Sequence, residues 1–71
     1  MPKLYSSDYI IKVLQKQGFV FISQKGSHQK YKKFDNSTLI VIVPANRKQI
    51  PIGTFKSILR QSNLSIGDFE R

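Results

Sequence analysis

One side chain in this 71-residue sequence can both accept and donate a proton near neutral pH, and it is the single histidine, His28. Lys25 lies shortly before it, and Lys30 and Lys32 follow at a spacing of two residues. Metal-free cleavage of an RNA phosphodiester needs a base for the 2′-hydroxyl, an acid for the leaving oxygen and cations for the charge that develops on the phosphate. One histidine among lysines supplies this minimum set.

Other interpretations of His28 must be weighed beside this one. A solitary histidine on a strand is more often structural than catalytic, by roughly three to one. A Ser27 nucleophile activated by His28 is excluded, because adjacent residues of a strand point to opposite faces. A Mg²⁺ or Zn²⁺ site is disfavoured, because the chain has four carboxylates, three of them near the termini, and no cysteine. We therefore expect neither a metal nor another cofactor.

The charge of the chain is strongly positive. Twelve lysines and arginines face four acids, and between residues 9 and 67 there are ten basic residues and a single acid, Asp35. A field of one sign destabilises a compact chain by self-repulsion, so a polyanionic partner is expected to offset it. Nucleic acid is the first expectation, ahead of a membrane surface or an acidic protein. The alternative is a basic protein whose charge serves only solubility.

Two helices are predicted, one near each end of the chain. A capping serine, Ser6 or Ser7, apolar residues at helical spacing and a terminating Gly18 predict a helix over residues 7–17. Pro51 opens a second helix that ends near Asn63, and a last helical turn carrying Phe69 follows. Strands are therefore expected in the region between the two helices.

Three short strands are predicted between the helices. Residues 19–23 are aromatic and β-branched, residues 28–34 alternate with a period of two, and residues 38–43 form a β-branched run suited to a central strand. Turn signals separate them at residues 25–27 and 35–37. Within the middle strand the predicted faces are His28, Lys30, Lys32 and Phe34 on one side and Gln29, Tyr31 and Lys33 on the other.

The predicted order of elements is helix, three strands, helix, which places the chain in the α+β class as one domain over residues 1–71. An antiparallel sheet of this kind can bury one face under both helices and leave the other face free. This αβββα order resembles the double-stranded RNA-binding fold. In a chain this short, every large apolar side chain is expected in the core. The longest apolar run, residues 39–44, is too short to span a membrane, and without a signal peptide a cytoplasmic protein is expected.

Candidate RNA-binding residues surround His28 and occupy the loop after the third strand. They are Lys25, Gly26, Ser27, Lys30, Tyr31, Lys32, Arg47 and Lys48. Tyr31 and Phe34 are interleaved with lysines, a pattern in which rings stack on unpaired bases while lysines hold phosphates. In the competing interpretation Phe34 is a core residue and Tyr31 is an ordinary strand residue without contact to RNA. For Phe34 we expect this competing interpretation, a place in the core.

Several segments together resemble a known family. They are Gln17-Gly18-Phe19, Gly26-Ser27-His28 with Tyr31 following, Val43-Pro44, and the stretch from Gly53-Thr54 to Gln61. In this order they are similar to the HicA family of bacterial toxins, over about residues 6–69. The resemblance implies a metal-independent endoribonuclease that cleaves messenger RNA with a histidine at the position of His28. It also implies a cognate HicB-like antitoxin that covers the His28 face.

The chain departs from the family pattern in one place. Many members carry a second histidine in the loop after the Val-Pro pair, where this chain has Asn46. A mechanism with two histidines therefore does not carry over. Two alternatives also remain from the residues alone, a double-stranded-RNA-binding module that does not cut its ligand and a DNA-binding protein.

Overall fold

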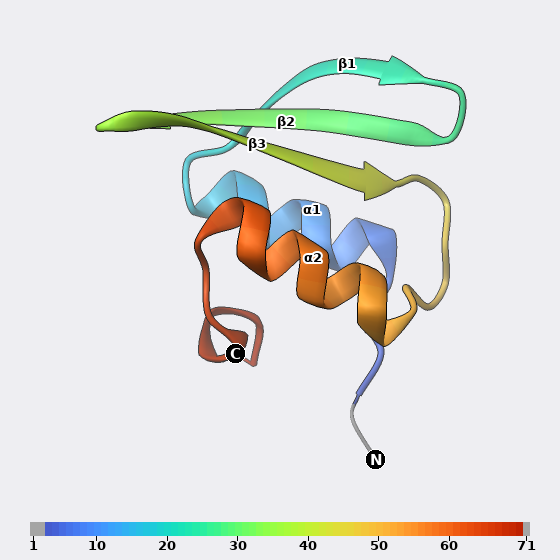
Figure 1. Cartoon of the computed structure of the whole chain (residues 1–71). Helices are drawn as coiled ribbons and strands as arrows, with labels where there is room; N and C mark the ends of the chain where they lie inside the picture. Colours follow the sequence, from blue (N-terminus) through green and yellow to red (C-terminus); the bar gives the residue numbers. More distant parts are fainter. Residues whose placement is uncertain (1–2, 71) are drawn as a thin grey trace.

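The computed structural model describes residues 3–70, apart from the side chain of Asp35. Two α-helices flank three strands, and a short 3-10 helix follows (Figure 1). The bounds are α1 Ser7–Lys16, β1 Val20–Lys25, β2 His28–Asp35, β3 Ser37–Pro44, α2 Ile52–Ser62 and η1 Ile66–Phe69. The predicted αβββα order is confirmed.

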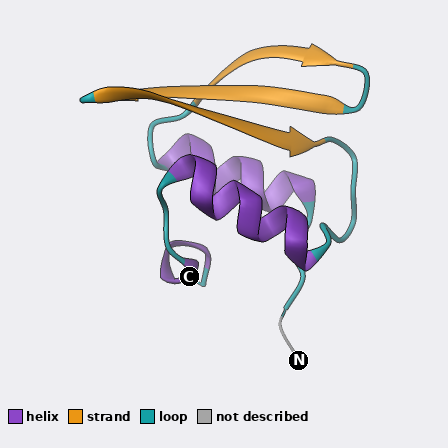
Figure 2. Cartoon of the chain, in the orientation of Figure 1, coloured by secondary structure: helices purple, strands orange, loops and turns teal. Residues whose placement is uncertain are grey.

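The strands form one antiparallel sheet in the order β1-β2-β3. Both α-helices lie on the same face of this sheet and leave the other face open (Figures 1 and 2). The expectation that residues 38–43 form the central strand is wrong, because two consecutive hairpins place the second strand in the middle. The central strand is therefore β2, which carries His28 and its neighbouring lysines.

The helix ends follow from local chemistry. The Ser6 hydroxyl accepts a hydrogen bond from the Tyr9 amide at 3.1 Å and so caps the start of α1. Beyond its end, Gly18 has a φ of 98°, which favours glycine and turns the chain into β1. The chain leaves α2 through Asn63, whose φ is 61°. These ends lie within a residue or two of the predicted ones.

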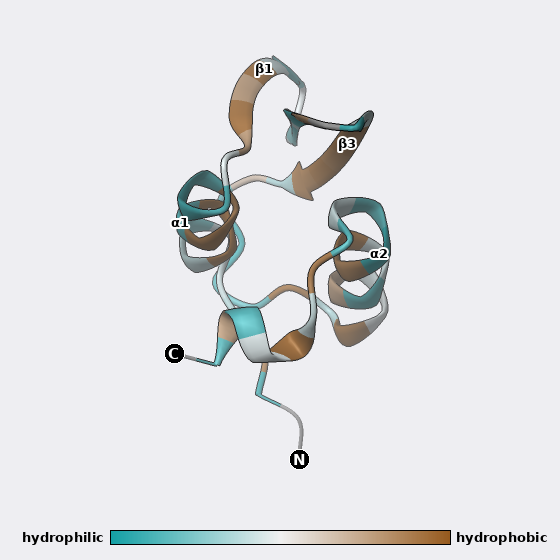
Figure 3. Ribbon diagram, turned by 90° about the vertical axis from the view of Figure 1, so that its left-hand side faces the viewer, coloured by the Kyte–Doolittle hydropathy of each residue, from teal (hydrophilic) through white to brown (hydrophobic). Residues whose placement is uncertain are grey.

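The core lies between the sheet and the two helices. Apolar segments of α1, α2 and β3 surround this space in the side view of Figure 3. Its buried side chains are Ile10, Val13, Leu14, Phe19, Tyr31, Val41, Val43, Ile50, Phe55, Ile58 and Phe69. Five of the eleven belong to the predicted apolar stripes of the two helices, namely Ile10, Val13 and Leu14 of α1 and Phe55 and Ile58 of α2.

Several large apolar residues lie outside this core, so the expectation that all of them would be buried is wrong. Val20, Phe21 and Ile22 of β1 are each about half exposed, and Phe34 is 77% exposed. The reason is geometric, because β1 is an edge strand that packs mainly on β2 and its register shifts between Phe21 and Ser23. Phe34 lies an even number of residues from His28 in β2, so its side chain is on the open face of the sheet.

A buried serine fixes the loop that follows β3. The Ser7 hydroxyl donates to the carbonyl of Pro44 at 2.6 Å and accepts from the Arg47 amide at 2.9 Å. The Ser7 amide in turn donates to the Arg47 carbonyl at 2.9 Å. Ser7 is fully buried, and these three hydrogen bonds hold the loop against the start of α1 and the end of β3.

Replacing Ser7 with alanine should lower the free energy of unfolding by about 1–3 kcal/mol, because the Pro44 carbonyl and the Arg47 amide both lose the hydroxyl of a buried side chain as their partner. Urea unfolding of the purified protein measures this change. Ser37→Ala, at an exposed serine of β3, is the matched control and should stay within about 0.5 kcal/mol of the parent. Equal stability of the two variants would contradict the anchoring role of Ser7.

Candidate functional site

His28 is the first residue of β2 and directly follows a two-residue hairpin turn. Gly26 has a φ of 59°, the backbone conformation that the first central residue of a type II′ turn requires. The register pairs His28 with Lys25 of β1 on one side and with Pro44 of β3 on the other. The imidazole therefore lies at the end of the sheet where the hairpin turn meets the loop after β3.

A depression of about 440 Å³ surrounds His28 on the open face of the sheet. All three strands contribute to its lining, which consists of Ser23, Lys25, His28, Lys30 and Ile42. The register explains this set, because Ser23, Lys30 and Ile42 form one cross-strand row and Lys25 and His28 belong to the next. Of the three lysines predicted near His28, the structure thus brings Lys25 and Lys30 into the depression, whereas Lys32 lies on the same face outside it.

The open face carries charge of one sign. Its ionisable side chains among the described residues are Lys25, His28, Lys30 and Lys32. Each of them is exposed, so the face presents several ammonium groups to solvent beside the imidazole. Such a face attracts phosphate, and the cations nearest His28 can stabilise negative charge that develops there.

The loop after β3 lies next to the hairpin turn. The Ala45 amide donates to the carbonyl of Ser27 at 2.6 Å and so joins the loop to the residue before His28. Asn46, the residue of this loop that departs from the family resemblance, is exposed and has a φ of 58°. Arg47 and Lys48 are exposed in the same loop, so their charges lie toward the His28 end of the sheet.

Tyr31 and Phe34 lie on opposite faces of β2. Tyr31, a candidate RNA-binding residue, lies in the core, and Phe34 lies on the open face. Tyr31 is only 3% exposed, its ring packs edge-on against Phe21, and its hydroxyl donates to Gln29 Oε1 at 2.7 Å. Burial raises the pKa of the Tyr31 hydroxyl, which keeps it a donor. Tyr31 is therefore not placed to stack on a base. Phe34, expected in the core, is the exposed ring.

Sequence reasoning missed three residues of this region. Ile42 and Ser23 line the depression but resemble ordinary strand residues, and only the register places them beside His28. Ser7 holds the neighbouring loop through contacts with residues 37 and 40 positions away in the chain. The period of two across the hairpins could have identified Ile42, whereas nothing in the sequence distinguishes Ser7 from a capping residue.

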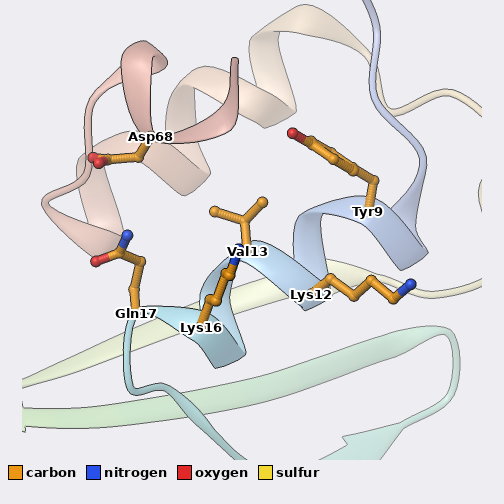
Figure 4. Close-up of a pocket in the computed structure, with 6 residues that line it drawn as sticks. All are labelled: Tyr9, Lys12, Val13, Lys16, Gln17 and Asp68. Carbon is orange, nitrogen blue, oxygen red and sulfur yellow. The ribbon is translucent and has the colours of Figure 1, made fainter. Parts of the chain in front are cut away.

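A second depression, of about 610 Å³, lies between α1 and η1 (Figure 4). Its lining shares no residue with the depression at His28 and consists of Tyr9, Lys12, Val13, Lys16, Gln17 and Asp68. Two of its polar groups already have structural tasks, since the Tyr9 hydroxyl donates to the Phe69 carbonyl and Asp68 accepts from the Ser65 amide at 2.9 Å. The depression at His28 is the better candidate for chemistry.

No group of three or more histidine, cysteine, aspartate or glutamate side chains within residues 3–70 is arranged to hold a metal ion. None of the helices described is long and apolar enough to cross a bilayer.

Comparison with known proteins identifies the family. The model of the family described as the HicA toxin of bacterial toxin-antitoxin pairs matches residues 7–64, from the first residue of α1 to just beyond α2. No curated protein matches the chain. The match covers His28, both hairpins and the loop after β3, and so includes the whole candidate site. This chain belongs to the HicA family, the toxins of bacterial toxin-antitoxin systems.

Proposed function

We propose that this toxin is an endoribonuclease that cleaves messenger RNA and thereby inhibits translation and growth, with His28 as its general acid and base. The observation that carries the proposal is the position of the single imidazole in a depression with Lys25 and Lys30. Family membership supports it, because a toxin must act on some essential process of its cell. Cytoplasmic messenger RNA is a polyanion that suits the cationic open face.

The chemistry requires only groups that the depression contains. Neutral His28 removes the proton from a ribose 2′-hydroxyl, and the resulting oxygen attacks the adjacent phosphorus. The bond from phosphorus to the 5′-oxygen breaks, and that oxygen takes a proton from the imidazolium. The products are a 2′,3′-cyclic phosphate and a 5′-hydroxyl, and His28 returns to its neutral form. A single histidine thus suffices without a partner at Asn46.

The lysines around His28 have distinct tasks in this proposal. Lys25 faces His28 across the β1–β2 pair, and Lys30 lies in the next cross-strand row. Both ammonium groups stabilise the charge of the pentacoordinate phosphorane, which exceeds the charge of the starting phosphate. Gly26 and Ser27 allow the RNA backbone to approach closely, since nothing lies within 4 Å of the position that a Gly26 Cβ would occupy.

Residues beyond the depression extend the RNA path. Lys32 continues the open face of β2 away from His28, and Arg47 and Lys48 extend the positive charge into the loop after β3. Their contacts are with phosphates and so do not depend on base identity.

The HicA family implies a cognate antitoxin as the partner of this toxin. We propose that the antitoxin covers the His28 face and offers acidic groups to it. Such a complex would hide the depression and offset the charge of the open face, which would keep RNA out.

Replacing His28 with alanine should lower RNA cleavage by about 10²- to 10⁴-fold, the usual contribution of a general acid–base group. Expression without antitoxin in a bacterial host should then no longer arrest growth or degrade messenger RNA. Lys56→Ala is the matched control, because Lys56 is exposed on α2 at the covered face of the sheet. Cultures are compared by growth curves and by the integrity of total messenger RNA.

Equal growth arrest and RNA degradation by the parent and His28→Ala would exclude His28 as the catalyst. Tight RNA binding by the purified parent without any cleavage would instead favour the alternative, a binding module. Unfolding curves of His28→Ala must match those of the parent, and they are expected to, since the imidazole is exposed.

Replacing Lys30 with glutamine should weaken RNA binding and reduce its salt dependence by about 0.7 in the slope of log affinity against log salt, as expected for one lost phosphate contact on a single strand. Binding is measured in a His28→Ala background so that the RNA stays intact. Lys56→Gln removes the same charge from α2 and should leave the slope unchanged. An equal change of slope in both variants would mean that net charge, and not the position of Lys30, controls binding.

A further inference from the structure

The open face of the sheet has a second half, at the end of β2 away from His28. Phe34 lies there, and at 77% exposure it is the most exposed of the large apolar side chains in the described part of the chain. Its register partner is Thr38 of β3, close to the hairpin at Asn36. Burial of an aromatic ring is one of the largest apolar contributions available to so small a fold, and an exposed ring is informative where other exposed apolar residues adjoin it.

The surroundings of Phe34 combine apolar surface with a cation. Lys32 lies two residues before it on the same face, between Val20 of β1 and Ile40 of β3 in one cross-strand row. Val20 is 58% exposed and Ile40 is 40% exposed. These four residues, Val20, Lys32, Phe34 and Ile40, form what we call the distal patch.

The charge of the face selects the kind of ligand. Apart from His28, the ionisable side chains described on it are lysines, from Lys25 at the His28 end to Lys32 in the distal patch. A ligand that combines negative charge with flat apolar surfaces fits both properties, and an RNA strand with unpaired bases is such a ligand. An RNA duplex fits less well, because its bases are stacked on each other and present only their edges.

We propose that Phe34 is a base-stacking residue, so that the RNA crossing the open face must be single-stranded over the length of β2. Six residues of extended strand place Phe34 about 20 Å from His28. The phosphates between these two points run past Lys30 and Lys32, while an unpaired base stacks on the Phe34 ring. This inference rests on the proposed function, since it takes the His28 depression as the site of cleavage. It names single-stranded RNA as the substrate class.

The test is RNA binding in a His28→Ala background, where cleavage plays no part. Phe34→Ala should weaken binding of a short single-stranded RNA of mixed sequence by about 5- to 150-fold, as expected when one base loses its aromatic platform. Binding of a blunt RNA duplex of the same sequence should change less than twofold. A fluorescent 2-aminopurine in the single strand should be quenched by the parent and remain bright with Phe34→Ala.

Matched variants separate stacking from other effects. Phe34→Tyr should retain the parent affinity, whereas Phe34→Leu, which keeps apolar bulk without an aromatic face, should behave as Phe34→Ala. Ile66→Ala removes an exposed apolar side chain from η1, on the far side of the helices from the open face, and should bind as the parent does. The salt dependence should be the same in the parent and Phe34→Ala, because the ring makes no phosphate contact.

Unchanged single-strand binding by Phe34→Ala would overturn the proposal, and so would an equal loss for single strand and duplex. Weaker binding of the antitoxin with unchanged RNA binding would also overturn it, since Phe34 would then be a protein contact. These outcomes are independent of catalysis. Failure of the proposed function would be seen in a different experiment, because the His28→Ala variant would then still cleave RNA.

Discussion

The pairing of β2 with a strand on each side is the constraint on which the rest of the structure depends. It sets the alternation along residues 28–34, which directs Tyr31 into the core and Lys30 and Lys32 to the open face. A slip of one residue would bury lysines under the helices and expose the tyrosine, so the core and the site fix the register together. The catalytic proposal thus depends on the same hydrogen-bonded ladder as the stability of the fold.

The separation of a buried apolar face of the sheet from an open face with lysines explains how a short chain carries a large positive charge. The helices and the inner face of the sheet supply the buried apolar surface, while the described lysines other than the half-buried Lys33 occupy exposed positions where solvent screens their repulsion. The loop after β3 needs its own anchor, because it has no strand partner. Ser7 supplies that anchor and keeps Arg47 near the His28 end of the sheet.

Local patterns in the sequence predicted most of the fold. Helix caps, the turn at Gly26 and the period of two in β2 depend on neighbouring residues, and they gave the element order and the face of His28 correctly. The period of two places Phe34 on the face of His28, but which face of the sheet the helices cover, and which strand lies at its edge, are set by tertiary packing that no local pattern records. The strand register, which the period of two could have supplied, is what places Ile42 in the site.

The chemical form of the RNA ends tests the central claim most directly. Purified toxin is incubated with a defined messenger RNA in excess chelator, and the fragments are analysed by mass spectrometry. A lone histidine acting on the 2′-hydroxyl predicts cleavage without metal that leaves 2′,3′-cyclic phosphates and 5′-hydroxyls, and His28→Ala should yield neither. Fragments with 5′-phosphates, or cleavage that stops in the chelator, would contradict the role of His28.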